Sequence, residues 1–240
     1  MRSYEEIYNE VKLKLSEKRF YHSVCTMQRA VEYANIYGED EEKIKLIAIA
    51  HDIAKELNKE EIIELVGKYN IKLDDLEKES IALSHSKIGA AIAKNEFGFN
   101  EEMTSAIKFH TTGRENMTIM EKIIFVADAT GSDRNFEDTE EVYNLAKKNL
   151  DDAIMKILIE TIKDIVENRK TMHLDTIRTY NYYVKKVKNG WYIYQPFFTF
   201  LNNFISNKFF CSDLGNNNPI KIHLYGATFV TLLLNKAWTK

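Results

Sequence analysis

The first 187 residues contain no proline, and their apolar residues recur at intervals of three and four. That interval is the spacing of one buried face of an α-helix. No segment in this range alternates apolar and polar residues convincingly, as a half-buried strand would. Residues 1–187 are therefore predicted to form an all-α domain.

Capping residues indicate where the helices begin. Ser3 and Glu6 have the spacing of a capping box, and Asp40, Asn58, Asn100 and Thr118 can each cap a following helix. After the helix that Ser3 opens, further helices are predicted at about residues 22–38, 43–60, 59–70, 79–98, 100–110, 117–129, 138–170 and 176–186.

The composition changes after Gly190. The remaining residues hold both prolines and both tryptophans of the chain together with many Phe and Tyr residues, but few charged ones. They show no clean helical or strand period. Residues 188–240 are therefore predicted to be an irregular, aromatic-rich C-terminal extension that the domain does not need.

The bulk properties restrict the function classes. A net charge of −3 is too small to indicate a nucleic-acid or membrane-surface partner. Cys25 and Cys211 make no disulfide framework, which favours a reducing compartment. The first ten residues lack the pattern of a signal peptide, and no uncharged apolar run is long enough to cross a bilayer. We expect a cytoplasmic protein without nucleic-acid or membrane partners.

A His-Asp doublet interrupts an apolar helix face in "KIKLIAIAHDIAKELNKE", residues 43–60. His51 falls between Ile47 and Ala54 on that face, and Asp52 lies beside it. His22, His85 and His110 also fall on or next to apolar faces. Taken singly, each of these histidines is more often a hydrogen-bonded structural residue than a ligand.

Asp128 favours a metal site. It lies on or beside the apolar stripe near the end of its predicted helix, and no basic residue stands three or four positions away. A buried carboxylate without a cation costs several kcal/mol, so a metal ion is an economical partner. Imidazole and carboxylate donors together suit Fe, Mn, Zn, Ni or Co. The predicted ligands are His22, His51, Asp52 and Asp128.

In this order, on helices, these residues resemble the H…HD…D signature of the HD-domain metallohydrolases. The closer resemblance is to the YqeK family, the bacterial symmetrical dinucleoside-tetraphosphate hydrolases. It covers residues 1 to about 187 and is carried by "RFYHSV", "AHDIAKE", "LSHSKIGA", "AIKFHTTGR", "EKIIFVADA", "DRNF" and "HLDTIR".

The resemblance implies an HD-domain helical bundle and an iron-dependent enzyme that cuts diadenosine tetraphosphate symmetrically into two ADP. It carries over the four ligands named above, with one or two ions bound. His85 and His110 match histidines that hold a second metal or contact phosphate, and with Asp128 they form the implied catalytic group. The implied substrate contacts are His22, Cys25, His85, His110, Thr111, Asp128, Arg134, His173, Leu174, Asp175, Thr176 and Arg178.

Two segments depart from the family pattern. An acidic residue and a proline are replaced by Gly131 and Ser132, and a proline is replaced by Leu174. Neither change removes an implied ligand, but both leave the nucleotide contacts open. Also open are the identity and number of the metal ions, a homodimeric state, and the histidine that donates a proton.

Two other functions compete with the tetraphosphatase. One is another HD-type nucleotide phosphohydrolase, and the other is a non-enzymatic metal- and nucleotide-binding sensor. The doublet continues as Ile53-Ala54-Lys55, without the elements of the cyclic-dinucleotide phosphodiesterases. A sensor could lose a ligand without penalty, so the presence of all four weighs against it.

Overall fold

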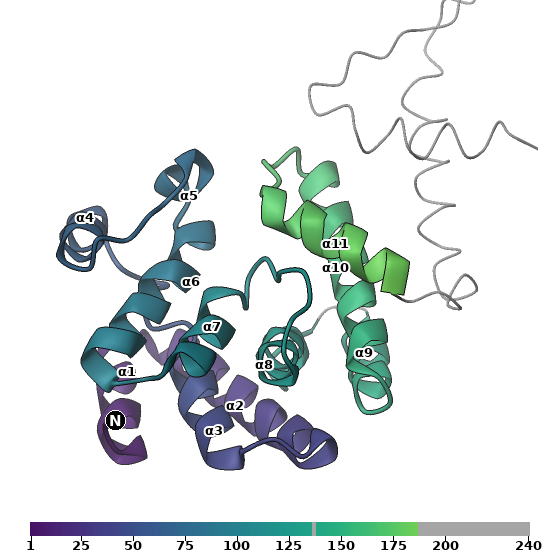
Figure 1. The fold of residues 1–240 in the computed structure, drawn as a ribbon, viewed down its shortest axis with the longest axis horizontal. Helices are drawn as coiled ribbons and strands as arrows, with labels where there is room; N and C mark the ends of the chain where they lie inside the picture. Colours follow the sequence, from purple (N-terminus) through teal and green to yellow (C-terminus); the bar gives the residue numbers. More distant parts are fainter. Residues whose placement is uncertain (136–137, 187–240) are drawn as a thin grey trace, which may run out of the picture. The chain divides into compact units, whose positions relative to one another are not determined.

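Helices make up the regular structure of the part of the chain that is described, and no strand occurs there (Figure 1). The structure is a computed structural model that describes residues 1–135 and 138–186. The elements are α1 (Tyr4–Lys14), α2 (Glu17–Tyr37), α3 (Glu41–Ala50), α4 (Lys59–Lys68), α5 (Asp75–Glu79), α6 (Ile81–Ile92), the π-helix η1 (Ala93–Phe97), α7 (Glu101–Lys108), α8 (Ile119–Thr130), α9 (Thr139–Ala146), α10 (Leu150–Glu167) and α11 (Leu174–Lys186).

The predicted caps are confirmed. Ser3, Asn58 and Thr118 each form a complete capping box with the glutamate three residues later. Asp40 and Asn100 each accept a hydrogen bond from a backbone N–H of the first turn. These side chains satisfy N–H groups that have no partner within the helix, and this explains why the starts of the helices could be predicted.

Several predicted helices have different bounds. α2 begins at Glu17 because Ser16 caps it, five residues before the predicted start. The segment 138–170 is two helices, since Asn149 accepts a hydrogen bond from Asp151 N and opens α10. The segment 79–98 is α6 followed by η1, which ends at Gly98 with φ at +75°.

The helix predicted over residues 43–60 ends at Ala50, so His51 and Asp52 lie in the turns that follow α3. Ile53 N donates to Ala50 O, and Lys55 N donates to Asp52 O. These bonds span three residues instead of four, so they tighten the backbone relative to an α-helix. The apolar surroundings of His51 and Asp52 were nevertheless predicted correctly, because the helix that precedes them, α3, is buried on nearly all sides.

The core lies where α2 packs against both α3 and α8, while α7 contacts α3, α6 and α8. Figure 1 shows α2, α3, α7 and α8 close together, with α10 next to α9 and α11. Five segments distant in sequence therefore meet: α2, the end of α3, α6, the end of α7, and α8. Each of them carries one or two of the predicted histidines and aspartates.

No helix among residues 1–135 and 138–186 combines the length and apolar character of a bilayer-spanning segment. The predicted C-terminal extension, residues 188–240, lies outside the described residues.

Candidate metal centre

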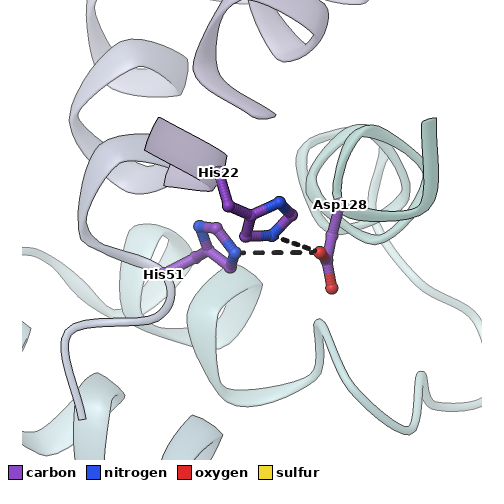
Figure 2. Close-up of side chains that lie close together, drawn as sticks. All are labelled: His22, His51 and Asp128. Carbon is purple, nitrogen blue, oxygen red and sulfur yellow. Dashed lines mark hydrogen bonds and ion pairs between the residues drawn. The ribbon is translucent and has the colours of Figure 1, made fainter. Parts of the chain in front are cut away.

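The six predicted donors gather at one place. We call this group the buried donor cluster: His22, His51, Asp52, His85, His110 and Asp128. Figure 2 shows His22 and His51 directed toward Asp128. The Nε2 atom of His22 lies 2.9 Å from Asp128 Oδ1, and that of His51 lies 3.9 Å from the same oxygen. Three separate segments thus direct their polar atoms to a common point.

The backbone of the preceding turn orients three of these histidines. Each places Nδ1 near a carbonyl oxygen three or four residues earlier: 2.6 Å for His51 and Ala48, 2.7 Å for His110 and Ile107, and 3.0 Å for His85 and Ile81. A carbonyl oxygen only accepts, so Nδ1 carries the proton and donates it. The neutral ring then presents the lone pair of Nε2 to the cluster.

Asp52 lies between these rings and a cation. Its Oδ2 accepts a hydrogen bond from Arg19 Nη1 at 2.9 Å. Its Oδ1 lies 3.1 Å from Nε2 of His85 and 3.6 Å from Nε2 of His110. Arg19 therefore fixes the carboxylate and leaves one oxygen directed at the histidine lone pairs.

Several atoms of this cluster that could bind a metal are hydrogen-bond acceptors without an ordinary partner. His51 Nε2 and Asp52 Oδ1 are buried without one. Nε2 of His85 and Nε2 of His110 lie 3.0 Å apart, with a lone pair on each when both rings are neutral. Unpaired buried acceptors are costly, and an ion bound among them removes the cost. Buried imidazole and carboxylate donors, with no thiolate among these six residues, suit a divalent transition metal.

The electrostatics keep four of the six donors, His51, Asp52, His85 and Asp128, in the forms that bind a metal. Burial lowers the pKa of His51 and of His85 to about 4, so both rings are neutral near pH 7. Burial would raise the pKa of Asp52, but the neighbouring histidines outweigh it and hold that pKa well below its usual value. Burial would also raise the pKa of Asp128, but His22 and Arg134 hold that pKa well below its usual value.

The sequence argument about Asp128 was incomplete. No basic residue stands three or four positions away, but Arg134 Nη2, from six positions later, lies 2.5 Å from Asp128 Oδ1. The chain turns back after α8, with Arg134 N donating to Gly131 O, so a residue six positions later reaches the carboxylate. Helical spacing does not extend through a turn, which is why the pairing was missed.

The predicted substrate contacts next to the cluster are Thr111 and Arg134. Thr111 Oγ1 lies 3.3 Å from Nε2 of His110, and Arg134 Nη2 lies 3.2 Å from Nε2 of His22. Cys25 is buried one turn after His22. Lys55 also reaches the cluster, with Nζ 3.2 Å from Nε2 of His85, and burial lowers its pKa.

The predicted contacts on α11 surround a different histidine. His173 Nε2 lies 2.8 Å from Asp74 Oδ2 and 3.7 Å from Glu77 Oε1. We call these three residues the His173 cluster. Thr176 is buried, whereas Leu174 and Arg178 are exposed, and Arg178 pairs with Asp175. These contacts tie α11 to the start of α5.

The middle of α11 packs on the loop that follows His110. Gly113 has φ at +65°, and a Cβ there would lie 2.7 Å from the side chain of Thr179. Tyr182 donates to Asn116 in the same loop. α11 therefore covers the segment that begins with Thr111, and its role toward a nucleotide stays a prediction.

Sequence reasoning missed two carboxylate contacts around the ligands. It did not assign a role to Arg19, which holds Asp52, or to Asp133, whose Oδ2 lies 2.9 Å from His22 Nδ1. Both contacts join residues far apart in the sequence, 33 and 111 positions. No local pattern reports such pairs.

Comparison with known proteins agrees with this geometry. A family model described as HD domain matches residues 19–133. The symmetrical bis(5'-nucleosyl)-tetraphosphatase of Halalkalibacterium halodurans is 38% identical over 172 residues, which is 71% of this chain and 91% of the relative. The enzyme of the same name from Bacillus subtilis is 34% identical over 181 residues, 75% of this chain and 97% of the relative.

A solved structure has the same fold. The crystal structure of a "predicted HD superfamily hydrolase involved in NAD metabolism" from Clostridium acetobutylicum is 36% identical, with a TM-score of 0.74. It is matched over 78% of this chain and 99% of its own. The resemblance read from the sequence is thereby confirmed. The chain belongs to the HD-domain family that contains these symmetrical bis(5'-nucleosyl)-tetraphosphatases.

Proposed function

We propose that this protein is a metal-dependent hydrolase that cuts diadenosine tetraphosphate, and related dinucleoside tetraphosphates, symmetrically into two nucleoside diphosphates. One observation carries the proposal: the buried donor cluster lies in a chain 38% identical to a symmetrical tetraphosphatase over 91% of that enzyme's length. The substrate is a small nucleotide, and we place the enzyme in the cytoplasm.

His22, His51, Asp52 and Asp128 are the proposed ligands. The unpartnered atoms His51 Nε2 and Asp52 Oδ1 support this choice. So does the grouping of His22, His51 and Asp128 atoms within 4.8 Å of one another. The resemblance favours iron, while Mn, Co, Ni and Zn suit the same donors. When bound, such an ion polarises a phosphoryl oxygen and lowers the pKa of coordinated water.

A second group of donors adjoins the first. His51, Asp52 and His110 also lie within the same short distance of one another, and His85 is 3.0 Å from His110. These residues either hold a second ion or contact the phosphate chain. His85 and His110, whose Nε2 atoms face the cluster, are the proposed proton donors to the leaving phosphate, and either ring must first take up a proton at Nε2 to act in this way.

Cationic side chains at the cluster match the charge of a polyphosphate. Lys55 and Arg134 both have nitrogen atoms within 3.2 Å of a cluster histidine. Arg114, a further basic residue in the loop after His110, instead donates from Nε to Glu121 at 2.9 Å. We therefore assign phosphate binding to Lys55, Arg134 and the hydroxyl of Thr111.

The test combines metal analysis with product identification. Purified protein should contain a transition metal, and diadenosine tetraphosphate should yield ADP as the only initial nucleotide product. In ¹⁸O-labelled water one labelled oxygen should enter for each pair of ADP molecules, because water adds across a single anhydride bond. The control is the His51→Ala protein, prepared in parallel.

Other results would favour a competing function. AMP and ATP as first products would exclude symmetric cleavage, and rapid turnover of other nucleotides alone would indicate a different HD phosphohydrolase. Metal-loaded protein that binds the nucleotide without turnover would be a sensor.

A further inference from the structure

His22 differs from the other histidines of the buried donor cluster in what orients it. His51, His85 and His110 use backbone carbonyl oxygens. His22 Nδ1 instead lies 2.9 Å from a carboxylate oxygen of Asp133, in the turn after α8. The ring is buried, and its Nε2 faces Asp128. The orientation of this one ligand therefore depends on a side chain from a distant segment.

The turn that carries Asp133 leaves room for its carboxylate at Gly131. A Cβ built on Gly131 would lie 2.7 Å from Asp133 Oδ1, 3.5 Å from Thr26 N and 3.6 Å from Cys25 Cβ. Gly131 has φ at −53° and ψ at 148°, a conformation that any residue adopts. The position thus needs glycine for space and not for its backbone angles.

We propose that Asp133 is a positioning residue for the metal ligand His22, and that Gly131 lacks a side chain so that the Asp133 carboxylate can reach the ring. The inference rests on the metal site proposed above. It adds a role for two residues outside the ligand set, and it couples them as a pair.

The physical effect of the contact is on the tautomer and the angle of the ring. Both ring nitrogens of His22 face a carboxylate, Asp133 at Nδ1 and Asp128 at Nε2. With Nε2 bound to a metal ion, the ring keeps its one proton on Nδ1, where Asp133 accepts it. The nearby negative charge also makes Nε2 a stronger electron-pair donor to a metal ion. Without Asp133, the buried Nδ1–H has no acceptor in that place, and the ring can adopt the other tautomer or rotate.

The first measurement is metal affinity. Zn²⁺ serves as the probe, and its dissociation constant is measured by competition with a chromophoric chelator in the full-length chain. Asp133→Ala should weaken Zn²⁺ binding by about 10- to 100-fold, the usual effect of removing an outer partner of a ligating histidine. The Zn²⁺ affinity of Asp133→Asn should lie between those of wild type and Asp133→Ala, because the asparagine side-chain oxygen still accepts from Nδ1–H. Ser132→Ala, an exposed neighbour in the same turn, should bind like wild type.

The coupling with Gly131 gives a second measurement. Gly131→Ala should weaken Zn²⁺ binding in the wild-type background, because the new methyl group displaces the carboxylate. In the Asp133→Ala background the same substitution should have little further effect, which is the signature of two residues acting through one contact. Circular dichroism and melting curves on each variant verify that the helices persist.

The third measurement reads the ring directly. In ¹⁵N NMR spectra of the Zn²⁺-loaded protein, His22 should show a protonated Nδ1 in wild type and lose that slowly exchanging proton in Asp133→Ala. Zn²⁺ affinity within twofold of wild type in Asp133→Ala, with an unchanged Nδ1–H signal, would overturn the inference and leave the metal site standing. Absence of Zn²⁺ binding by the wild-type protein would overturn both.

Discussion

Two groups in this protein combine histidine with carboxylates, and they use the imidazole in opposite ways. In the buried donor cluster, Nδ1 of three histidines donates to the backbone, so Nε2 keeps a lone pair. In the His173 cluster, Nδ1 accepts from the backbone N–H of Asp175, so Nε2 carries the proton and donates it to Asp74. Glu77 there is already paired with Lys87.

The difference shows that residue types alone do not define a metal site. Both groups contain three His, Asp or Glu residues with donor atoms close enough to hold an ion. In the His173 cluster the protein itself already uses both ring nitrogens. In the buried donor cluster, acceptors remain without partners. The availability of lone pairs separates a candidate metal centre from a contact that joins two helices.

The largest expected effect separates the two groups by metal content. His51→Ala and Asp52→Ala should each abolish bound metal and turnover, because the ion loses a donor that the apolar surroundings cannot replace. Far-UV circular dichroism should be retained, since the helix faces still pack. His173→Ala should keep full metal content, as measured by elemental analysis. Full metal and a normal rate in Asp52→Ala would refute the ligand assignment.

The second effect is a loss of stability in acid that arises in the buried donor cluster. In the folded state burial lowers the pKa of His51 from 6.5 to about 4, so the unfolded chain binds the proton more readily. Stability of the metal-free protein is therefore lost as the pH falls from about 6.5 to about 4. His51 contributes about 3 kcal/mol over this window, and His85 acts in the same direction.

His22 partly opposes this loss. Burial would lower its pKa, but the hydrogen bond with Asp128 outweighs burial and raises it, so His22 stabilises the fold as it becomes protonated. Thermal melts between pH 7.5 and pH 4.5, with chelator present, measure the net change in stability from these opposing histidines. His51→Gln should flatten the dependence. A melting temperature that stays constant over this range would contradict a neutral, buried His51.

A smaller effect is expected at the His173 cluster. His173→Ala removes the acceptor for Asp175 N and the donor to Asp74, and should lower the free energy of unfolding by about 1 kcal/mol. Urea unfolding followed by circular dichroism measures it, with Arg178→Ala on the exposed face of α11 as the control. A loss of metal in His173→Ala would show that the two groups are not independent.

The smallest effect is expected from removing the C-terminal extension. A chain that ends at Lys188 retains both groups, and we propose that residues 1–187 are sufficient for folding and turnover. Its metal content and rate should equal those of the full chain within about twofold, and it should aggregate less because fewer aromatic residues are present. A shortened chain that fails to fold would show that the extension belongs to the core.

The sequence predicted what local interactions decide. The caps at Ser3, Asn58 and Thr118 satisfy their own first turns, so the helix starts were predicted without knowledge of the fold. The apolar environment of His51 followed from the residues around it. The six donors of the cluster were all named, because each falls on or next to an apolar helix face in the sequence pattern.

The contacts that complete the site depend on turns and long-range packing. The tight turns after Ala50, which carry His51 and Asp52, were read as helix because their apolar spacing continues the helical pattern. The pairing of Arg134 with Asp128 requires the chain to reverse after α8. Asp133 meets His22 only because that turn packs beside α2. Helical periodicity contains no information about such reversals.

The carbonyl oxygens that orient His51, His85 and His110 belong to the backbone, and this has an evolutionary consequence. A mutation in the gene replaces a side chain but leaves the peptide carbonyl in place, so these three orientations are inherited together with the helices. The acceptor for His22 is encoded by a single codon, at position 133. Selection can therefore strengthen, weaken or relocate this one interaction, and adjust the centre, without altering the fold.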